Sequence, residues 1–569
     1  MNGKTEGSAE FSAWNPGIGT GIPEPFRSLE TIFRPECVFS EIGEVREFAG
    51  LTGLPDEELT VFKPERLVLH EIIIRVTADI AVAEGAEEED FGWNFRGIAG
   101  HIRDTYVKPR MDAIRDAYAD LRQRADGLVR QFLAETLFSP PAPAEPPRPW
   151  WRRLGKPMTP VAESAVERDH RAIAAYKAAG LASDDPLRRA LFKSLYRVLN
   201  AIAGKRGSVI ADPDLLARLV VQHVCNTYGS QLIGQMIAPL VATAIEQEGY
   251  ARVPNRETPV LISLKGASAA GKSSLRPLIK RIMRNQGIES DGYATISPDV
   301  WRRLLLDYES LGPARKYAGH LTSRELLVID GKLDRYIRDK ANRSHAIPHF
   351  LVDRFRFDSF SSDKVTRVLH DTYAKYVDTM YMYFIVTPPE ETVERGWQRA
   401  LTRGRYKAVE DFLGHNVEAY SGMPKILFKW LAYRHPSYRY YFLDNRVPKG
   451  TFPKTVAFGD QSEMTIYDPV VLINIERYQK ININARTPGE VYPSPALMTV
   501  AANSGFLKEC IRRIPLVRFT ERASGIAYLA VRDGNIEVLD AAVLARIMTD
   551  SESAEAIAEI APRLNASRS

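Results

Sequence analysis

Apolar positions in the N-terminal part of the chain recur with helical spacing. Between Met111 and Phe132 they return alternately every three and four residues, which places one continuous apolar stripe along a helix. The stripe consists of Met111, Ile114, Tyr118, Leu121, Ala125, Leu128 and Phe132. This pattern is typical of a helix packed in a bundle, and the alternative is a helix that binds a partner or a second copy.

Two further helices are predicted where an Asp-Pro pair precedes a periodic apolar segment. Asp185-Pro186 and Asp212-Pro213 each offer a capping carboxylate followed by a proline at the first helical position. The most apolar long run, Leu232–Ile245, is shorter than the ~20 residues that span a bilayer. We expect it to form a buried helix, and we expect no membrane span.

From Pro259 onward the pattern changes to short apolar runs separated by helical segments. The runs are VLISL (260–264), YATI (293–296), HFLVD (349–353), YMYFIV (381–386) and YYFLDN (440–445). Strands that alternate with helices predict an α/β fold with a parallel sheet covered by helices. Near the C-terminus, Asp533-Gly534 between two β-rich runs predicts a hairpin, followed by a helix in DAAVLARIM (540–548).

Changes in composition divide the chain into six predicted segments. The clearest boundary is SPPAPAEPPRPWW (139–151), whose prolines favour an extended linker. The segments are a disordered N-terminus (1–26), a helical domain (27–138), a Pro-rich linker (139–160), a second helical domain (161–250), an α/β domain (251–460) and a small α+β module (461–569).

Charge and cysteine content narrow the possible functions. The formal net charge is only +5, from 76 Lys and Arg against 71 Asp and Glu, so no general affinity for nucleic acid is expected. Three scattered cysteines indicate neither a disulfide framework nor a zinc site. Since the N-terminus also lacks an apolar signal region, we expect a cytoplasmic protein.

The first candidate site is GASAAGKS (266–273), which fits the phosphate-binding pattern G-x-x-x-x-G-K-[ST]. It follows a predicted buried strand and precedes a predicted helix. Backbone amides would surround phosphate oxygens, Lys272 would reach the β- and γ-phosphates, and Ser273 would bind Mg²⁺. The predicted nucleotide-binding residues are Gly266, Ala267, Ser268, Ala269, Ala270, Gly271, Lys272, Ser273 and Ser274.

Two acidic residues follow predicted strands and should face the same edge of the sheet as the loop. Asp299 can accept a proton from a hydroxyl group, with Arg302 three residues later to hold an acceptor or a phosphoryl group. Asp353 ends another strand and is a candidate Mg²⁺ ligand together with Ser273. The alternative is that both carboxylates cap helices or loops.

An arginine-rich segment, VERGWQRALTRGRYK (393–407), is predicted to close over the site. Arg395, Arg399 and Arg403 are four residues apart and share one helix face. Planar guanidinium groups bind phosphoryl oxygens in pairs, so these side chains, with Arg405 and Lys407, are typical of a lid. A solvated basic helix face is the alternative.

The order of these motifs resembles the zeta-toxin family of P-loop kinases, over about Pro259 to Gly459. The resemblance implies a kinase that uses ATP or GTP with Mg²⁺ and phosphorylates the 3′-hydroxyl of UDP-N-acetylglucosamine or a similar small acceptor. It implies catalytic roles for Lys272, Asp299 and Arg302 and for one or two arginines of the lid, among them Arg399 and Arg403. It places Arg395, Asp444 and Asn445 near the nucleotide.

The acceptor side departs from the family pattern. The family strand that corresponds to HFLVD ends in Glu-Gly, whereas this chain has Asp353-Arg354. Acceptor contacts are implied in the stretch between Asp299 and Asp353, where helix-surface roles are an equal alternative. The candidates are Arg302, Lys316, Tyr317, His320, Thr322, Arg324 and Glu325.

Three functions therefore remain open. The first is a phosphotransferase acting on a nucleotide sugar or another small hydroxylated molecule. The second is a polynucleotide 5′-hydroxyl kinase, for which KWLAYRHPSYRYY (429–441) would supply an aromatic channel, with buried packing as the alternative. The third is a nucleotide-binding switch in which the N-terminal helices bind a protein partner. Those helices are also candidates to cover the site within the same chain.

Overall fold

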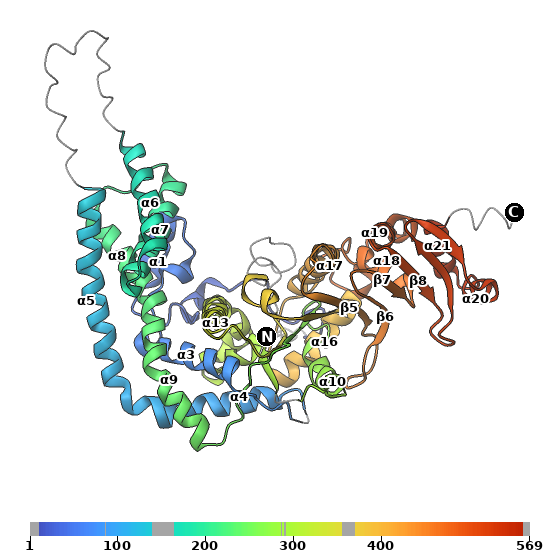
Figure 1. Cartoon of the computed structure of the whole chain (residues 1–569), viewed down its shortest axis with the longest axis horizontal. Helices are drawn as coiled ribbons and strands as arrows, with labels where there is room; N and C mark the ends of the chain where they lie inside the picture. Colours follow the sequence, from blue (N-terminus) through green and yellow to red (C-terminus); the bar gives the residue numbers. More distant parts are fainter. Residues whose placement is uncertain are drawn as a thin grey trace, which may run out of the picture. The chain divides into compact units, whose positions relative to one another are not determined.

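The chain forms two compact units. The computed structural model describes residues 11–85, 87–138, 164–285, 287–289, 292–354 and 370–561. The α/β unit comprises Met1–Glu24, Ile74–Ile98 and Gly249–Ser569, and the helical unit comprises Pro25–Ile73 and Ala99–Glu248 (Figure 1). The predicted domain boundaries differ from this division. Helices on both sides of the Pro-rich linker belong to one unit, and Ile74–Ile98 belongs to the other.

The helical unit contains the helices that the apolar spacing and the Asp-Pro pairs predict. Asp185 accepts a hydrogen bond from the amide of Arg188, and Asp212 accepts from Leu215. Its α-helices are α1 (Ile42–Thr52), α2 (Asp56–Leu59), α5 (Met111–Thr136), α6 (Ala165–Ala182), α7 (Pro186–Arg206), α8 (Pro213–Val224) and α9 (Ser230–Gln247). Shorter turns are η1 (Glu24–Leu29), η2 (Ile102–Val107), η3 (Lys108–Arg110) and η5 (Cys225–Gly229). Two helices, α3 (Pro64–Asp79) and α4 (Asp90–His101), begin in one unit and end in the other.

The predicted stripe lies on the buried face of α5, with one difference near its end. Met111, Ile114, Tyr118, Leu121, Ala125 and Phe132 are buried, but Val129 takes the deepest position where Leu128 was expected. The prediction that Leu232–Ile245 is helical is also confirmed, since α9 includes it. The Pro-rich linker at 139–160 lies outside the described residues.

The α/β unit is built on a sheet of ten strands in the described residues, in the order β10-β9-β8-β7-β6-β5-β4-β1-β3-β2. The strands are β1 (Val260–Lys265), β2 (Tyr293–Ile296), β3 (His349–Val352), β4 (Thr379–Val386), β5 (Ser437–Asp444), β6 (Lys454–Gly459), β7 (Glu463–Ile466), β8 (Leu516–Thr520), β9 (Ala527–Arg532) and β10 (Asn535–Val538). The strands β2-β3-β1-β4-β5 pair in parallel. They coincide with the five predicted apolar runs, so the α/β prediction is confirmed.

The sheet continues beyond the predicted end of the α/β domain. Strand β6 pairs with β5 in antiparallel orientation, and β7 to β10 extend the same sheet. The C-terminal strands therefore do not form the separate module expected at 461–569. The predicted hairpin is confirmed, because Asp533 and Gly534 adopt positive φ angles of 48° and 80° between β9 and β10.

Helices pack on both the parallel and the antiparallel parts of this sheet. The longer ones are α10 (Lys272–Arg284), α13 (Ser323–Ser344), α16 (Pro389–Arg403), α17 (Val409–Leu431), α18 (Pro469–Arg477), α19 (Gly505–Arg513) and α21 (Ser551–Ile560). The shorter ones are α11 (Arg302–Leu305), α12 (Ala318–Leu321), α20 (Ala541–Ile547), η7 (Pro298–Trp301), η8 (Glu309–Tyr317), η9 (Ala374–Tyr376), η10 (Pro488–Glu490), η11 (Pro495–Met498) and η12 (Ala501–Asn503). Helix α10 buries Leu275, Ile279 and Met283 against apolar side chains of β1 and β4.

Part of the N-terminus is folded onto the α/β unit. Ala13 is buried in a cluster with Val393 and Phe412, and Trp14 Nε1 donates a hydrogen bond to Glu394 Oε1 at 2.8 Å. The predicted disorder of residues 1–26 is therefore wrong for residues 11–26, because apolar and aromatic side chains near Ala13 find a surface to pack on. Residues 1–10 lie outside the described residues.

Candidate functional site

The predicted phosphate-binding loop connects β1 to α10, as its sequence context indicated. Gly271 has a φ angle of 98°, and a Cβ atom there would lie 2.2 Å from Asn445 Nδ2. A Cβ atom on Gly266 would lie 3.1 Å from the carbonyl oxygen of Ile385. The positive φ angle at Gly271 is strained for other residues, and a side chain at Gly266 would make its neighbours shift slightly, so the loop geometry favours glycine at both positions.

Polar side chains from two other segments, and Lys272 of the loop itself, hold the loop in place. Asn445 Nδ2 donates to the carbonyl oxygen of Ala270 at 2.7 Å, and Thr387 Oγ1 donates to the same oxygen at 3.1 Å. Lys272 Nζ donates to the carbonyl oxygens of Gly266 (3.0 Å) and Ala267 (2.9 Å), so its side chain lies over the loop. Burial lowers the pKa of this ammonium group. An anion in the loop would compensate for that burial.

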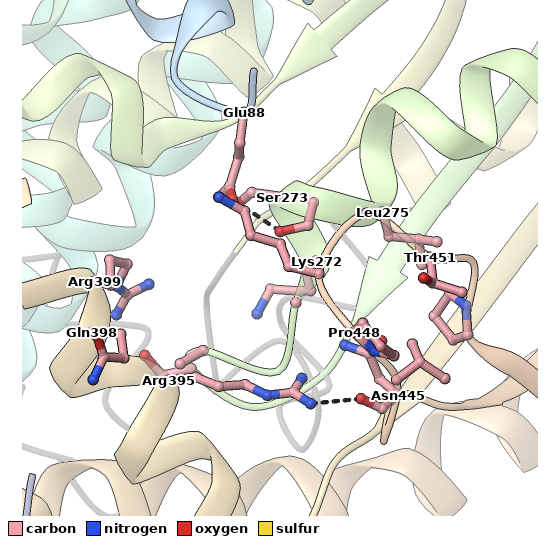
Figure 2. A pocket seen from close by; sticks show the side chains of 18 of the residues that line it. Glu88, Lys272, Ser273, Leu275, Arg395, Gln398, Arg399, Asn445, Pro448 and Thr451 are labelled. Carbon is pink, nitrogen blue, oxygen red and sulfur yellow. Dashed lines mark hydrogen bonds between the residues drawn. The ribbon is translucent and has the colours of Figure 1, made fainter. Parts of the chain in front are cut away.

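A cavity of about 530 Å³ opens beside the loop (Figure 2). We call it the nucleotide cavity. Of the predicted site residues it is lined by Ser268, Ala269, Gly271, Lys272, Ser273, Ser274, Asp299, Asp353, Arg395, Arg399, Arg403, Arg405 and Asn445. Ala267 and Ala270 are buried within the loop. The structure thus brings together residues from five separate sequence segments that were predicted as one site.

Ser273 and Asp353 form the pair that was predicted to bind a metal. Ser273 Oγ donates to Asp353 Oδ2 at 3.0 Å. Burial raises the pKa of the Asp353 carboxyl, although the charges of Lys272 and Arg276 oppose this effect. No group of three or more His, Cys, Asp and Glu side chains in the described part of the chain is arranged to hold a metal ion. One carboxylate and one hydroxyl fit Mg²⁺, which usually takes most of its ligands from phosphates and water.

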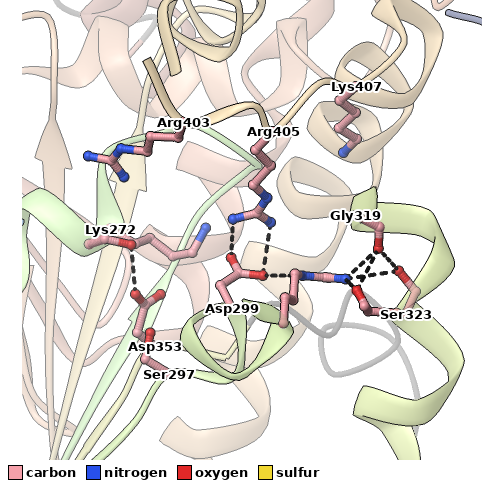
Figure 3. A network of polar contacts seen from close by, with 12 residues as sticks. Lys272, Ser297, Asp299, Gly319, Ser323, Asp353, Arg403, Arg405 and Lys407 are labelled. Carbon is pink, nitrogen blue, oxygen red and sulfur yellow. Dashed lines mark hydrogen bonds and ion pairs between the residues drawn. The ribbon is translucent and has the colours of Figure 1, made fainter. Parts of the chain in front are cut away.

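Asp299 lies between two arginines (Figure 3). Arg405 donates to both of its oxygens, at 2.7 Å and 2.9 Å, and Arg302 Nε donates to Oδ1 at 3.1 Å. Burial by itself would raise the pKa of Asp299, but the charges of Arg405 and Arg302 outweigh it and hold that pKa well below its usual range. The carboxylate is therefore fully ionised at neutral pH and can orient a hydroxyl group by accepting its hydrogen bond.

The arginines of α16 have different partners. Arg395 Nη2 donates to Glu391 and to the carbonyl oxygen of Asn445, both at 2.7 Å. Arg403 forms ion pairs with Glu88 at 3.1 Å and with Glu89. Arg399 lines the nucleotide cavity, and its Nε is buried without a hydrogen-bond partner. Burial, and then the charge of Arg405, lower the pKa of the Arg399 guanidinium group. Arg399 is the arginine of this helix best placed to receive an anion.

Three acidic residues that the sequence analysis missed also reach the site. We call Glu84, Glu88 and Glu89 the acidic segment. Glu88 accepts hydrogen bonds from Ser274 Oγ at 2.9 Å and from Arg403 at 3.1 Å. Burial opposes ionisation of Glu88, but the hydrogen bond and charge of Arg403 outweigh it and lower its pKa. The run EGAEEED (84–90) was a visible signal, because its charge is opposite to that of the lid.

Glu84 supports the wall of the nucleotide cavity behind Asp353. It accepts from Arg276 Nε at 2.8 Å and pairs with Lys280 Nζ at 2.9 Å. Only 1% of Arg276 is exposed, and its Nη1 also donates to Ser297 and lies 3.6 Å from Asp353 Oδ2. Two buried cations of α10 therefore depend on a carboxylate almost two hundred residues earlier in the chain.

Several predicted acceptor and nucleotide residues lie elsewhere. His320 pairs with Asp411 at 3.2 Å, and Thr322 is buried, where it accepts from Arg302 at 2.7 Å. Asp444 is bound by Arg446 at 2.8 Å at the end of β5. None of these three, nor Tyr317 or Arg324, lines the nucleotide cavity. The reason is that a residue faces the cavity only where separate elements pack around it, which spacing within one segment does not reveal.

Two other predicted groups have structural roles. Trp430, Tyr438 and Tyr440 are almost completely buried, so they cannot stack on nucleic-acid bases, and the packing interpretation of residues 429–441 is confirmed for them. Lys316 lies over the Phe11 ring at 3.7 Å. Lys407 contacts His415 Nδ1.

No family model, curated protein or solved structure matches this chain. None of the helices in the described residues is both long and apolar enough to cross a membrane.

Proposed function

We propose that the α/β unit is a Mg²⁺-dependent P-loop phosphotransferase that moves the γ-phosphate of ATP or GTP to a hydroxyl group of a small molecule. One observation carries the proposal. The loop 266–271 opens into the same cavity as the hydrogen-bonded pair of Ser273 and Asp353 and the arginine-bound carboxylate of Asp299. One cavity thus contains residues suited to bind the donor, to bind the metal ion and to orient the acceptor.

The donor would lie with its phosphates against the loop amides and the N-terminus of α10. Lys272 would exchange its two carbonyl partners for β- and γ-phosphate oxygens. Ser273 and Asp353 would hold Mg²⁺, which supplies positive charge to the phosphates when it is bound. The role of Asp353 requires its ionised form, and Lys272 and Arg276 favour that form.

Transfer would proceed in line, with a bond from the acceptor oxygen to the γ-phosphorus forming as the bond to the bridging oxygen breaks. The hydroxyl proton passes to Asp299 and then to solvent. The low pKa of Asp299 makes it a weak base, which suits a loose transition state that needs an oriented hydroxyl more than an alkoxide. Arg399, which has no partner at Nε, would neutralise the charge on the transferred group.

The acceptor class expected from the resemblance is a nucleotide sugar or a similar hydroxylated metabolite. Because Trp430, Tyr438 and Tyr440 are buried, the polynucleotide kinase hypothesis loses three of the aromatic side chains expected to form its channel. A nucleotide-binding switch would use the same donor site without transfer.

The test is a transfer assay with γ-labelled ATP and a metabolite extract, combined with a direct measurement of ATP affinity. The wild-type chain should bind ATP and label a small molecule, and Lys272→Ala should abolish the labelling. Asp299→Asn should lower the transfer rate by about 10²-fold and leave ATP affinity unchanged, since Asp299 faces the acceptor. Binding without transfer would favour the switch. Absence of ATP binding in the wild-type chain would refute the proposal.

A further inference from the structure

A second cavity of about 100 Å³ lies next to the first and shares Asp299, Arg399, Arg403 and Arg405 with it. We call it the arginine recess. Residues from α4 and the acidic segment line it together with residues that follow β2 and with residues of the lid. The recess therefore includes a part of the chain outside the region that resembles a known family.

Positive charge exceeds negative charge in this recess. Its lining contains Arg96, Arg276, Arg302, Arg303, Arg399, Arg403 and Arg405, but only Glu88, Glu89 and Asp299 as carboxylates. Four of the seven arginines have acidic partners: Arg276 with Glu84, Arg302 and Arg405 with Asp299, and Arg403 with Glu88 and Glu89. Among the described residues, no carboxylate forms an ion pair with Arg96, Arg303 or Arg399.

Arg96 and Arg303 are held in place by aromatic rings instead. The Arg96 guanidinium group lies 4.9 Å from the centre of the Trp93 ring, and that of Arg303 lies 4.6 Å from the centre of the Tyr308 ring. Arg303 also donates to the carbonyl oxygen of Arg403 at 2.9 Å. Burial, and then the charge of Arg303, lower the pKa of Arg96, and the charge of Glu89 only partly opposes them, so the two cations are close enough to repel each other. A bound anion would relieve this repulsion.

The position of the recess separates this anion from the donor. The donor phosphates have their own amides and Lys272 in the nucleotide cavity, whereas Arg96, Arg303 and Tyr308 line only the recess; Ser273 lines both. Asp299 belongs to both cavities. A molecule in the recess would present its hydroxyl group to Asp299 and any negative group to the two unpaired arginines.

We propose that the arginine recess binds an acceptor that carries a phosphate group, and that Arg96 and Arg303 recognise this phosphate. The inference rests on the proposed function, because it assigns the acceptor side of the same reaction. A phosphate has oxygens for two guanidinium groups at once, which suits a pair of arginines better than a single one. Arg96 is then a specificity-determining residue from outside the P-loop region.

The experiment uses the full chain with its donor site saturated by Mg²⁺, ADP and beryllium fluoride, which occupies the γ-phosphate position, and inorganic phosphate is the probe in a calorimetric titration. Wild-type protein should bind phosphate, and Arg96→Ala and Arg303→Ala should each weaken this binding about tenfold or more. ATP affinity should change less than about twofold in both variants, which also shows that they are folded. Arg439→Ala is the matched control, since Arg439 is exposed on β5 and lines neither cavity.

A second arm distinguishes phosphate from other anions. The metabolite extract is treated with a nucleotide pyrophosphatase and then with alkaline phosphatase, so that internal diphosphates and terminal phosphates are both removed. The two enzymes are taken out, and transfer from labelled ATP is measured again. Loss of labelling after this treatment supports an acceptor that carries a phosphate group, and unchanged labelling refutes it. The inference is also refuted if the labelled product proves to come from an acceptor that carried a carboxylate group and no phosphate. Absence of phosphate binding in the ADP-loaded wild type, or equal binding by the variants, also overturns the inference. If wild-type protein does not bind ATP, the proposed function itself fails.

Discussion

The nucleotide cavity and the arginine recess share Asp299 and Arg399 but are built in different ways. The cavity depends on backbone conformation, since the loop 266–271 and the first turn of α10 come from one short stretch. In this stretch Gly271 adopts a positive φ angle and Gly266 lies close to the carbonyl oxygen of Ile385. The recess depends on side-chain charges that come from α4, from the residues after β2 and from the lid. The nucleotide cavity is formed mainly by local backbone conformation. The arginine recess forms only because folding brings together charged side chains that are far apart in the sequence.

This difference suggests that the two sites respond differently to mutation. A site formed by backbone amides should lose its ligand affinity when the loop or its lysine is substituted. A site formed by several charged side chains should lose affinity in steps as single side chains are removed. The acidic segment contributes to both sites. Glu84 binds Arg276 behind the wall of the nucleotide cavity, and Glu88 accepts hydrogen bonds from Ser274 and Arg403. Three substitutions test the comparison.

The largest effect is expected for Arg399→Ala, at the arginine that lines both cavities. Transfer should fall by about 10³-fold, because no carboxylate among the described residues forms an ion pair with this guanidinium group and it would face the transferred phosphate. Steady-state transfer rates and ATP affinity would be measured side by side, with Arg439→Ala as the control. A loss of less than about tenfold would mean that Arg399 serves binding and not transfer.

Glu84→Gln should destabilise the α/β unit by about 3 kcal/mol, because Arg276 and Lys280 would keep their buried charges without a full counter-charge. Thermal unfolding of the full chain would report a lower transition temperature. Glu87→Gln is the matched control at an exposed neighbour that lines neither cavity. Equal transition temperatures for the two variants would show that Glu84 does not stabilise the cavity wall.

The smallest effect is expected for Glu88→Gln, and it has the opposite sign. A carboxylate that accepts from Ser274 and Arg403 competes with phosphate for the same donors, so its removal should tighten ATP binding about fivefold. The measurement is ATP affinity by titration, again against Glu87→Gln. Weaker binding would instead identify Glu88 as a residue that supports the donor.

Local chemistry in the sequence was enough to predict much of the fold. The five parallel strands are continuous apolar runs, Asp185 and Asp212 cap their helices through neighbouring amides, and Asp533-Gly534 makes a tight turn. The predicted phosphate-binding loop belongs to the same class, because its glycines and Lys272 lie within a few residues of one another. Such features depend on backbone preferences and short-range hydrogen bonds, which a short stretch of sequence already determines.

Only the tertiary structure decided which distant charges meet. The pairing of Glu84 with Arg276, the position of Arg96 in the recess and the burial of Thr322 have no signature in residue spacing, since they depend on how separate helices pack. The same holds for the continuation of the sheet through β6 and for Trp14 on Glu394. The sequence by itself determined the nucleotide cavity's loop, because local backbone geometry forms it. Only the fold determined the arginine recess, because charges from distant parts of the chain form it.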